Sequence, residues 1–302
     1  MSNPKRQHFV PRTYLKNFSF QKKKQSRVFV LDKMRRDIFE ANIENVAVEK
    51  DFYTVNNNDN NYIWEEYYAT RIEPMMAVTI SNLIKISQSC LIKNNAKILE
   101  DDLKIKLSII MISQLLRGQH CREFEQEILK KEGPKIVEKV KKIVDKLGNE
   151  KSKKLVENYE ISEDLFKLSA MDYALDEEKM CRLAEVLLNR YWVLYRINGN
   201  KEFITSDDPV VFMNNRTNDV TPFHNGLLHE ETSTYFPISP KLLIATYTYG
   251  TSLPFENNNI AFLDSEKENY RRFVDTINRK QMEHCNKHVF AKTKSVFELL
   301  NI

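Results

Sequence analysis

Apolar and polar residues alternate along much of the first sixty residues, which is the period of a β-strand. β-branched and aromatic residues alternate with polar ones in 27–33 and 37–49, and charged turn residues lie between the two segments. This pattern predicts two short strands and favours an antiparallel pair. A third strand is predicted at 52–55, followed by a loop at Asn57–Asn61, whose residues tolerate left-handed backbone.

The spacing changes to the helical period after residue 63. Apolar residues recur every three or four positions from Trp64 to Ile92, and Pro74 is expected to kink or divide this helix. A charged segment with a thin apolar stripe is predicted to form an exposed helix pair that turns at Gly148. The predicted helices after the first are 100–130, the exposed pair in 133–158, and 176–189.

The last third returns to strand-like segments and ends with one more helix and strand. The segments are strands at 190–198, 202–213 and 234–250, a helix at 265–285 and a strand at 288–293. Helices between two groups of strands predict an α+β fold: short N-terminal strands, a central helical region, and a C-terminal mixed or antiparallel sheet with a flanking helix. We expect one domain over 1–302, with a basic β segment at 1–62, helices at 63–189 and strands plus a helix at 190–302.

The composition is that of a soluble globular protein. The chain has 302 residues, 46 Lys or Arg against 42 Asp or Glu, and 42% hydrophobic residues. No apolar run approaches the roughly 18 residues of a membrane span, so we expect a cytoplasmic protein without a membrane partner. The four cysteines lie far apart, which signals neither a zinc site nor a disulfide framework, and no glycine-rich nucleotide motif occurs.

Positive charge is concentrated at the start of the chain. The first 36 residues carry eleven Lys or Arg and one Asp, so the remainder has a net negative charge. A basic arm on an acidic body is typical of a protein that binds nucleic acid or an acidic protein partner. The general abundance of lysine in an AT-rich genome explains the same count without a partner.

Two segments resemble a known family. QHFVPRTYLKNF at 7–18 and FITSDDPV at 203–210 resemble motifs of the bacterial domain of unknown function 4238 family. Further matching features follow in the same order: Phe52-Tyr53, a helix with Glu66 and Glu73, a helix with Gln114 and Arg117, and FPISP at 236–240. The resemblance spans most of the chain but implies no established reaction. Asp208 stands where family members more often carry Asn, so we assign no role to its charge.

Two candidate carboxylates lie on one helix. Glu66 and Glu73 are two turns apart and leave the same face, where they could hold a divalent cation or act as acid and base. A solvated surface with local ion pairs explains the same spacing. His8 is a candidate metal ligand or general base, or a histidine packed within the apolar motif.

Other candidates follow a strand and a helix. Ser206 and Asp207 stand before Pro209 at a strand end, where they could line a site, bind metal or form a turn. Arg117, three residues after Gln114, could bind phosphate or pair with a glutamate. The remaining histidines carry no prediction: His120 is too close to Arg117 for the spacing of helical ribonucleases, and a strand start separates His284 from His288.

These residues lead to one hypothesis and two alternatives. The hypothesis is a metal-assisted phosphodiesterase, a nuclease, that cleaves nucleic acid in defence against phage, with Mg²⁺ or Mn²⁺ as cofactor. The alternatives are a non-enzymatic module that binds nucleic acid or protein and contains a buried polar network, and an enzyme that acts on a small nucleotide. The assigned residues are His8, Glu66, Glu73 and Asp207 for catalysis; Glu66, Glu73 and Asp207 for metal; and Arg12, Lys16, Gln114, Arg117 and Ser206 for substrate.

Overall fold

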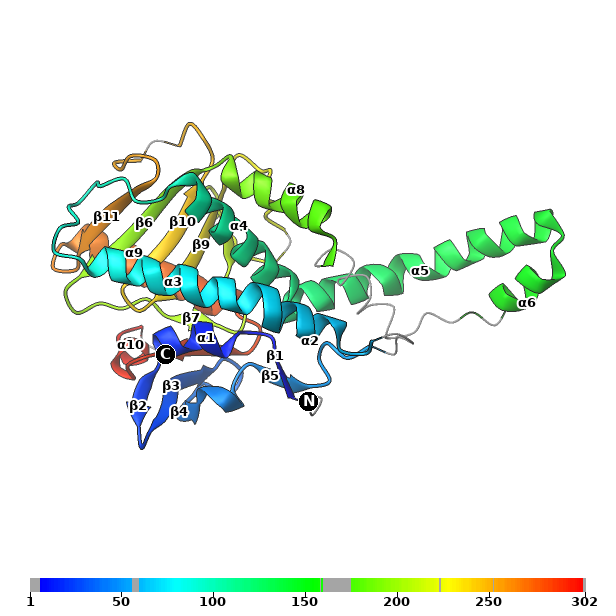
Figure 1. The fold of residues 1–302 in the computed structure, drawn as a ribbon, viewed down its shortest axis with the longest axis horizontal. Coiled ribbons are helices and arrows are strands. Elements are labelled where there is room, and N and C mark those ends of the chain that lie inside the picture. Colours follow the sequence, from blue (N-terminus) through cyan, green and yellow to red (C-terminus); the bar gives the residue numbers. More distant parts are fainter. Residues whose placement is uncertain are drawn as a thin grey trace.

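The computed structural model describes residues 6–55, 60–157, 159, 175–222, 224–251 and 253–300, and it has the predicted α+β fold. Two five-stranded sheets lie one above the other in Figure 1. The upper sheet has the longer strands and is called the larger sheet. Helices α3 (Glu73–Gln88) and α4 (Asp101–Leu116) cross its face. The predicted loop at Asn57–Asn61 falls mostly outside the described residues.

The N-terminal segment begins with a short strand and helix and continues into the predicted hairpin. The hairpin is β3 (Gln25–Asp32) paired antiparallel with β4 (Asp37–Asn42). β4 ends earlier than predicted because the Asn42 side chain accepts a hydrogen bond from the Glu44 amide and begins a 3₁₀ turn. The other elements are β1 (Arg6–His8), α1 (Arg12–Leu15), η1 (Lys16–Phe18), β2 (Phe20–Lys22), η2 (Ile43–Asn45) and β5 (Val48–Lys50).

The predicted strand at 52–55 is wrong. The partner of β1 is β5, which ends before this segment. The apolar pattern of this segment reflects burial in the main core and not alternation on a sheet. The buried residues are Phe52, Tyr53 and Val55. The backbone N–H of Tyr53 donates instead to the side-chain oxygen of Gln7.

Pro74 divides the first predicted helix. The chain forms α2 (Ile63–Tyr67), a π-helical turn η3 (Tyr68–Ile72) and then α3, whose first turn contains Pro74. A proline is tolerated there because the first helical N–H groups have no partner within the helix.

The predicted helix at 100–130 is two helices. α4 ends at Leu116, and α5 (Gln119–Leu147) begins after Gly118, whose backbone is extended. α5 then continues through Pro134, where a new helix was expected. The turn at Gly148 is confirmed: this residue has a positive φ of 68° and leads into α6 (Glu150–Glu157). The last helix of this region is α8 (Glu177–Leu188).

The larger sheet is mixed, with strand order β11-β6-β10-β9-β8. β11 runs parallel to β6, and the other neighbours are antiparallel. The strand-like segment 234–250 is a hairpin, and β11 was not predicted. The strands are β6 (Tyr191–Asn198), β8 (Val211–Asn214), β9 (Thr232–Ser239), β10 (Leu242–Tyr247) and β11 (Asn259–Asp264).

The second sheet joins the two ends of the chain. Its order is β2-β3-β12-β7, with β4 paired to β3, so β7 (Thr205–Ser206) and β12 (His288–Ala291) share a sheet with the N-terminal hairpin. The predicted strand at 202–213 is therefore divided: β7 belongs to this sheet and β8 to the larger one. Residues 207–210 pass between the sheets. α9 (Glu268–His284) packs on the larger sheet, and α10 (Ser295–Leu299), which was not predicted, ends the described chain.

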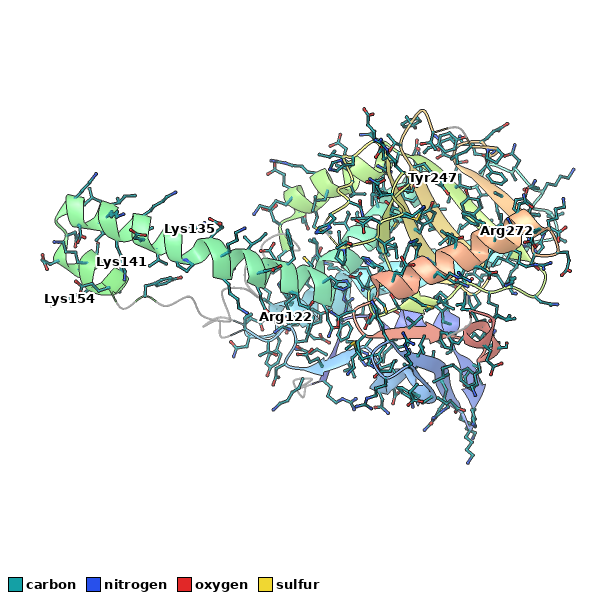
Figure 2. All side chains as sticks on the ribbon, turned by 180° about the vertical axis from the view of Figure 1, so that it is seen from behind. Arg122, Lys135, Lys141, Lys154, Tyr247 and Arg272 are labelled. Carbon is teal, nitrogen blue, oxygen red and sulfur yellow. The ribbon has the colours of Figure 1, made fainter. Side chains whose placement is uncertain are left out.

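The outer half of α5 and the antiparallel α6 project away from the body (Figure 1). Ile136 and Ile143 are more than half exposed, and Figure 2 shows Lys135, Lys141 and Lys154 along this projection. The predicted exposed helix pair is thus present. Within the described residues, no helix is both long and apolar enough to cross a membrane.

Candidate metal centre

A buried arginine ties the N-terminal motif to the helices. Arg117, at the end of α4, donates from Nε to the Tyr53 hydroxyl (3.0 Å) and from Nη2 to the backbone oxygen of His8 (2.6 Å). The same nitrogen lies 3.2 Å from Oε1 of Glu73, and the guanidinium stacks 4.3 Å from the ring centre of Tyr68. The neighbouring tyrosines and Glu73 raise the pKa of Arg117 although burial opposes its charge. Of the alternatives for Arg117, the structure shows a pairing with Glu73.

Two glutamines hold the same segment. Gln114 donates to the backbone oxygen of Phe9 (3.0 Å), and Gln7, which is completely buried, accepts from Tyr53 and donates to Thr54. These bonds satisfy backbone groups that would otherwise be buried without partners. Gln114 therefore holds the N-terminal motif in place.

The three carboxylates predicted to bind metal each have a different partner in the structure. Glu66 is exposed and accepts a hydrogen bond from Asn60, whereas Glu73 pairs with Arg117. The carboxylate of Asp207 accepts three backbone N–H groups, from Asn286, Lys287 and His288, at 2.7–3.0 Å. No metal-ligating group among the described residues contains two of these three carboxylates.

His8 and Ser206 have local surroundings of their own. The imidazole of His8 is half-buried, and burial together with Arg12 and Arg117 lowers its pKa to about 4. This histidine is therefore neutral at pH 7. Ser206 donates to the backbone oxygen of Asp208 and accepts from its amide, a turn that Gln281 also binds. Ser206 thus shapes the turn that the sequence allowed as an alternative.

The two substrate-binding residues proposed in the arm lie at the surface. Arg12 is 3.9 Å from Glu44 with both side chains exposed, and Lys16 is exposed at the start of η1. Glu40 of the hairpin also pairs with Lys22 and Arg27. Part of the arm's positive charge is therefore matched by acidic residues of β4 and η2.

The groups that come together are His120, Asp208 and His284. One ligand atom from each lies within 4.8 Å of the other two. Oδ2 of Asp208 is 2.7 Å from Nδ1 of His120 and 3.5 Å from Nε2 of His284. Tetrahedral or octahedral coordination of an ion with bonds near 2.1 Å places ligand atoms about 3.0–3.4 Å apart. Small adjustments of these side chains would thus produce a mononuclear site with two imidazoles and one carboxylate.

Three separate elements position this cluster. His120 is in the first turn of α5, His284 is the last residue of α9, and Asp208 follows β7 in the passage between the sheets. The carboxylate also lies against the N-terminus of α5: a Cβ on Gly118 would be 3.5 Å from Oδ2 of Asp208. The helix dipole favours the negative charge there.

The hydrogen bonds of the cluster leave ligand atoms available. Nδ1 of His284 lies 2.9 Å from the backbone oxygen of Val220, to which it donates, so Nε2 is the ring nitrogen that faces Asp208. This Nε2 and Oδ1 of Asp208 are both buried and have no hydrogen-bond partner among the described residues. Orphaned polar atoms in a buried site are costly unless an ion or water completes them.

The charges of the three groups depend on one another. Burial raises the pKa of Asp208, but the two imidazoles outweigh this and bring it to about 2. Burial lowers the pKa of His284, while Asp208 raises it more, so the net shift is upward. Asp208 is therefore ionised at neutral pH, as a metal ligand must be. A cation at the centre would replace the protons that now balance its charge.

The cluster is reached from a cleft. His120 and His284 line a cavity of about 430 Å³, together with Lys33 and residues of 218–222 and 283–286. Asp208 is only 1% exposed and lies behind them. A ligand in the cleft would therefore reach the imidazoles first.

Sequence reasoning missed all three residues. His120 and His284 were set aside because each was compared only with residues close to it in the sequence, and the charge of Asp208 was discounted. The available signal was the pair of adjacent aspartates in 203–210. Asp207 is used by the backbone, which leaves Asp208 for another partner.

The fold and the cluster together define an α+β protein with a candidate metal centre. The chain belongs to the family described as Protein of unknown function (DUF4238), whose model matches residues 6–295. This confirms the resemblance of the two motifs. Searches of curated proteins and of solved structures found no match.

Proposed function

We propose that the protein is a metal-dependent hydrolase, with the ion held by His120, Asp208 and His284. The observation that carries this proposal is the buried cluster itself, in which Nε2 of His284 and Oδ1 of Asp208 have no hydrogen-bond partner among the described residues. Two neutral imidazoles with one carboxylate suit Mn²⁺, Zn²⁺ or Fe²⁺ better than Mg²⁺, which prefers oxygen ligands. Of the two cofactors expected from the sequence, this donor set favours Mn²⁺.

The three side chains have distinct parts in this proposal. His284 is held by the Val220 carbonyl and presents Nε2, while His120 presents Nδ1 at the edge of the cleft. Asp208 supplies the negative charge through Oδ2, and its Oδ1, which has no hydrogen-bond partner among the described residues, is available to accept a hydrogen bond from a water in the site. The ion would supply Lewis acidity and an activated water.

Nucleic acid is the substrate class that we propose. Its support is the basic arm in the sequence and the lysines along the projecting helices (Figure 2), which together suit a polyanion. The cleft is open to the surface beside Lys33 of the arm. A role in defence against phage belongs to the same hypothesis and follows only if cleavage is found.

Metal binding is tested directly. Purified, chelator-treated protein is titrated with Mn²⁺ and Zn²⁺ by calorimetry, and its melting temperature is followed. We expect one ion per chain for the wild type and at least tenfold weaker binding for Asp208→Asn and His284→Gln. His224→Gln, at an exposed histidine, is the control and should bind as the wild type does. Equal binding by all four proteins would refute the metal centre.

Cleavage is tested with labelled RNA, single-stranded DNA and double-stranded DNA, with each metal and with chelator. We expect metal-dependent cleavage by the wild type that Asp208→Asn and His120→Gln lack. If the wild type binds metal but cleaves none of these substrates, the nuclease assignment fails and the metal centre stands.

A second candidate is a binding module without catalysis, and a specific observation favours it. Gln114, Arg117, Ser206 and Asp207 are all buried and each is bonded to the backbone, so four of the nine predicted site residues form structural contacts. On this alternative, His120→Gln and Asp208→Asn would lower stability without changing a reaction.

A further inference from the structure

A second cleft lies where the arm meets α9 and α10. It has a volume of about 550 Å³, within the range of sites for small ligands. Its floor is apolar and its rim is charged. The lining residues are Leu31, Asp32, Lys33, Arg36, Arg279, Met282, Glu283, Val289 and Leu300.

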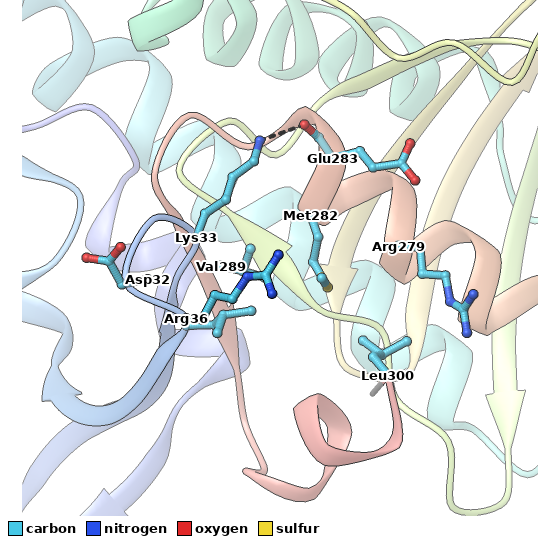
Figure 3. Close-up of a pocket in the computed structure, with 9 residues that line it drawn as sticks. Asp32, Lys33, Arg36, Arg279, Met282, Glu283, Val289 and Leu300 are labelled. Carbon is cyan, nitrogen blue, oxygen red and sulfur yellow. Dashed lines mark hydrogen bonds between the residues drawn. The ribbon is translucent and has the colours of Figure 1, made fainter. Parts of the chain in front are cut away.

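Two arginines of the rim come from separate parts of the chain. Figure 3 shows Arg36, in the turn of the β3–β4 hairpin, on one side of Met282 and Leu300, and Arg279 of α9 on the other. The turn is well defined, because the Arg36 amide donates to the Asp32 oxygen. Both arginine side chains are exposed, and the structure gives their guanidinium groups no hydrogen bond or ion pair with described residues.

The other charged groups of this cleft are already engaged. Lys33 donates to the backbone oxygens of Glu283 and Cys285, the first of which is drawn in Figure 3. Glu283 pairs with Lys280, and one oxygen of Asp32 accepts two backbone N–H groups. The two arginines therefore supply the free charge of the cleft, and that charge is positive.

The floor distinguishes this cleft from a simple anion site. Leu31, Val289 and Leu300 are buried at the base of the cleft. Met282, which is half-buried and has a flexible, polarisable side chain, supplies most of the accessible apolar surface of the floor. Inorganic phosphate would leave this surface unused. A phosphate ester with a flat or apolar organic part would contact the floor and the arginines together.

We propose that this cleft binds a phosphate monoester with an aromatic organic part, such as a nucleoside monophosphate. The phosphate binds Arg36 and Arg279, and the ring packs over Met282. The site is separate from the metal centre, although Lys33 and Glu283 line both clefts. The proposal therefore does not depend on the proposed hydrolase activity.

The test is calorimetric titration in chelator with three probes: AMP, phenyl phosphate and inorganic phosphate. We expect AMP and phenyl phosphate to bind at least tenfold more tightly than inorganic phosphate. Arg36→Gln and Arg279→Gln should each weaken AMP binding about tenfold or more, as loss of a charge-assisted contact does. Met282→Gln should weaken AMP binding while leaving the weak binding of inorganic phosphate unchanged.

Arg272→Gln is the matched control, because Arg272 lies two turns earlier on α9 and pairs with Glu268 outside the cleft. It should bind AMP as the wild type does. All three arginine variants should keep the melting temperature of the wild type, because the side chains they replace are exposed. Absence of AMP binding, binding no tighter than that of inorganic phosphate, or wild-type AMP affinity in both Arg36→Gln and Arg279→Gln would overturn the proposal.

Discussion

Replacing Arg117 with methionine tests whether this arginine holds the N-terminal motif in place. Methionine retains much of the apolar stem but removes the guanidinium that stacks on Tyr68, together with its bonds to the Tyr53 hydroxyl, the His8 oxygen and Glu73. Breaking a buried ion pair by removing one partner costs about 3–5 kcal/mol. The carboxylate of Glu73 is partly exposed, so the lower end applies, and we expect a loss of about 3 kcal/mol.

The assay is urea unfolding followed by circular dichroism, with Arg122→Met as the control. Arg122 stacks 4.6 Å from the Phe52 ring centre and donates one long bond to the Phe52 oxygen, and it is only half-buried. Its loss should cost about 1 kcal/mol. Arg117→Lys keeps the charge without the planar fork and should fall between the two. A loss under about 1 kcal/mol for Arg117→Met, or one no larger than that of the control, would refute the reasoning.

The other predictions concern groups with contrasting surroundings. Asp207→Ala should destabilise the fold by at least about 2 kcal/mol in urea unfolding, because three backbone N–H groups lose their acceptor; a neutral result would contradict that role. Glu66→Gln should change stability by less than about 0.5 kcal/mol and leave metal binding unchanged, since this side chain is exposed; lost metal binding would restore Glu66 as a ligand. The pKa of His8 falls from 6.5 to about 4 on folding, so the unfolded chain takes up the proton first as the pH falls. The contribution of His8 to the free energy of unfolding is therefore complete above pH 6.5 and is lost as pH falls towards 4. His8→Phe should therefore lose less melting temperature than the wild type between pH 7 and pH 4.5, with His224→Gln as the unchanged control, and parallel curves would exclude this explanation.

Much of the fold could be predicted because it is local. The helical period marked α3, α4 and α8, and alternation marked the β3–β4 hairpin, since a period reports which side of an element is buried. The errors arose where tertiary contacts replaced local rules. Phe52 and Tyr53 are buried without being in a strand. α4 ends at Leu116, just before Arg117 and Gly118, which pack against the N-terminal motif and Asp208.

The candidate site was much less predictable. The motifs at 7–18 and 203–210 were correctly singled out, but Gln7, Ser206 and Asp207 within them bind backbone and so position the chain. Adjacent aspartates illustrate the difficulty. Asp207 accepts three backbone N–H groups and Asp208 faces two histidines, although their local sequence is nearly the same.

The sequence by itself determined the family, the fold class and most of the elements, because these depend on period, composition and motif. Only the tertiary structure decided which side chains meet. His120 begins one helix, His284 ends another and Asp208 lies between two sheets, so no spacing along the chain links them. Their meeting depends on β7 pairing with β12 and on α9 ending beside α5. Such long-range pairings are set by the packing of the whole core and not by any local pattern.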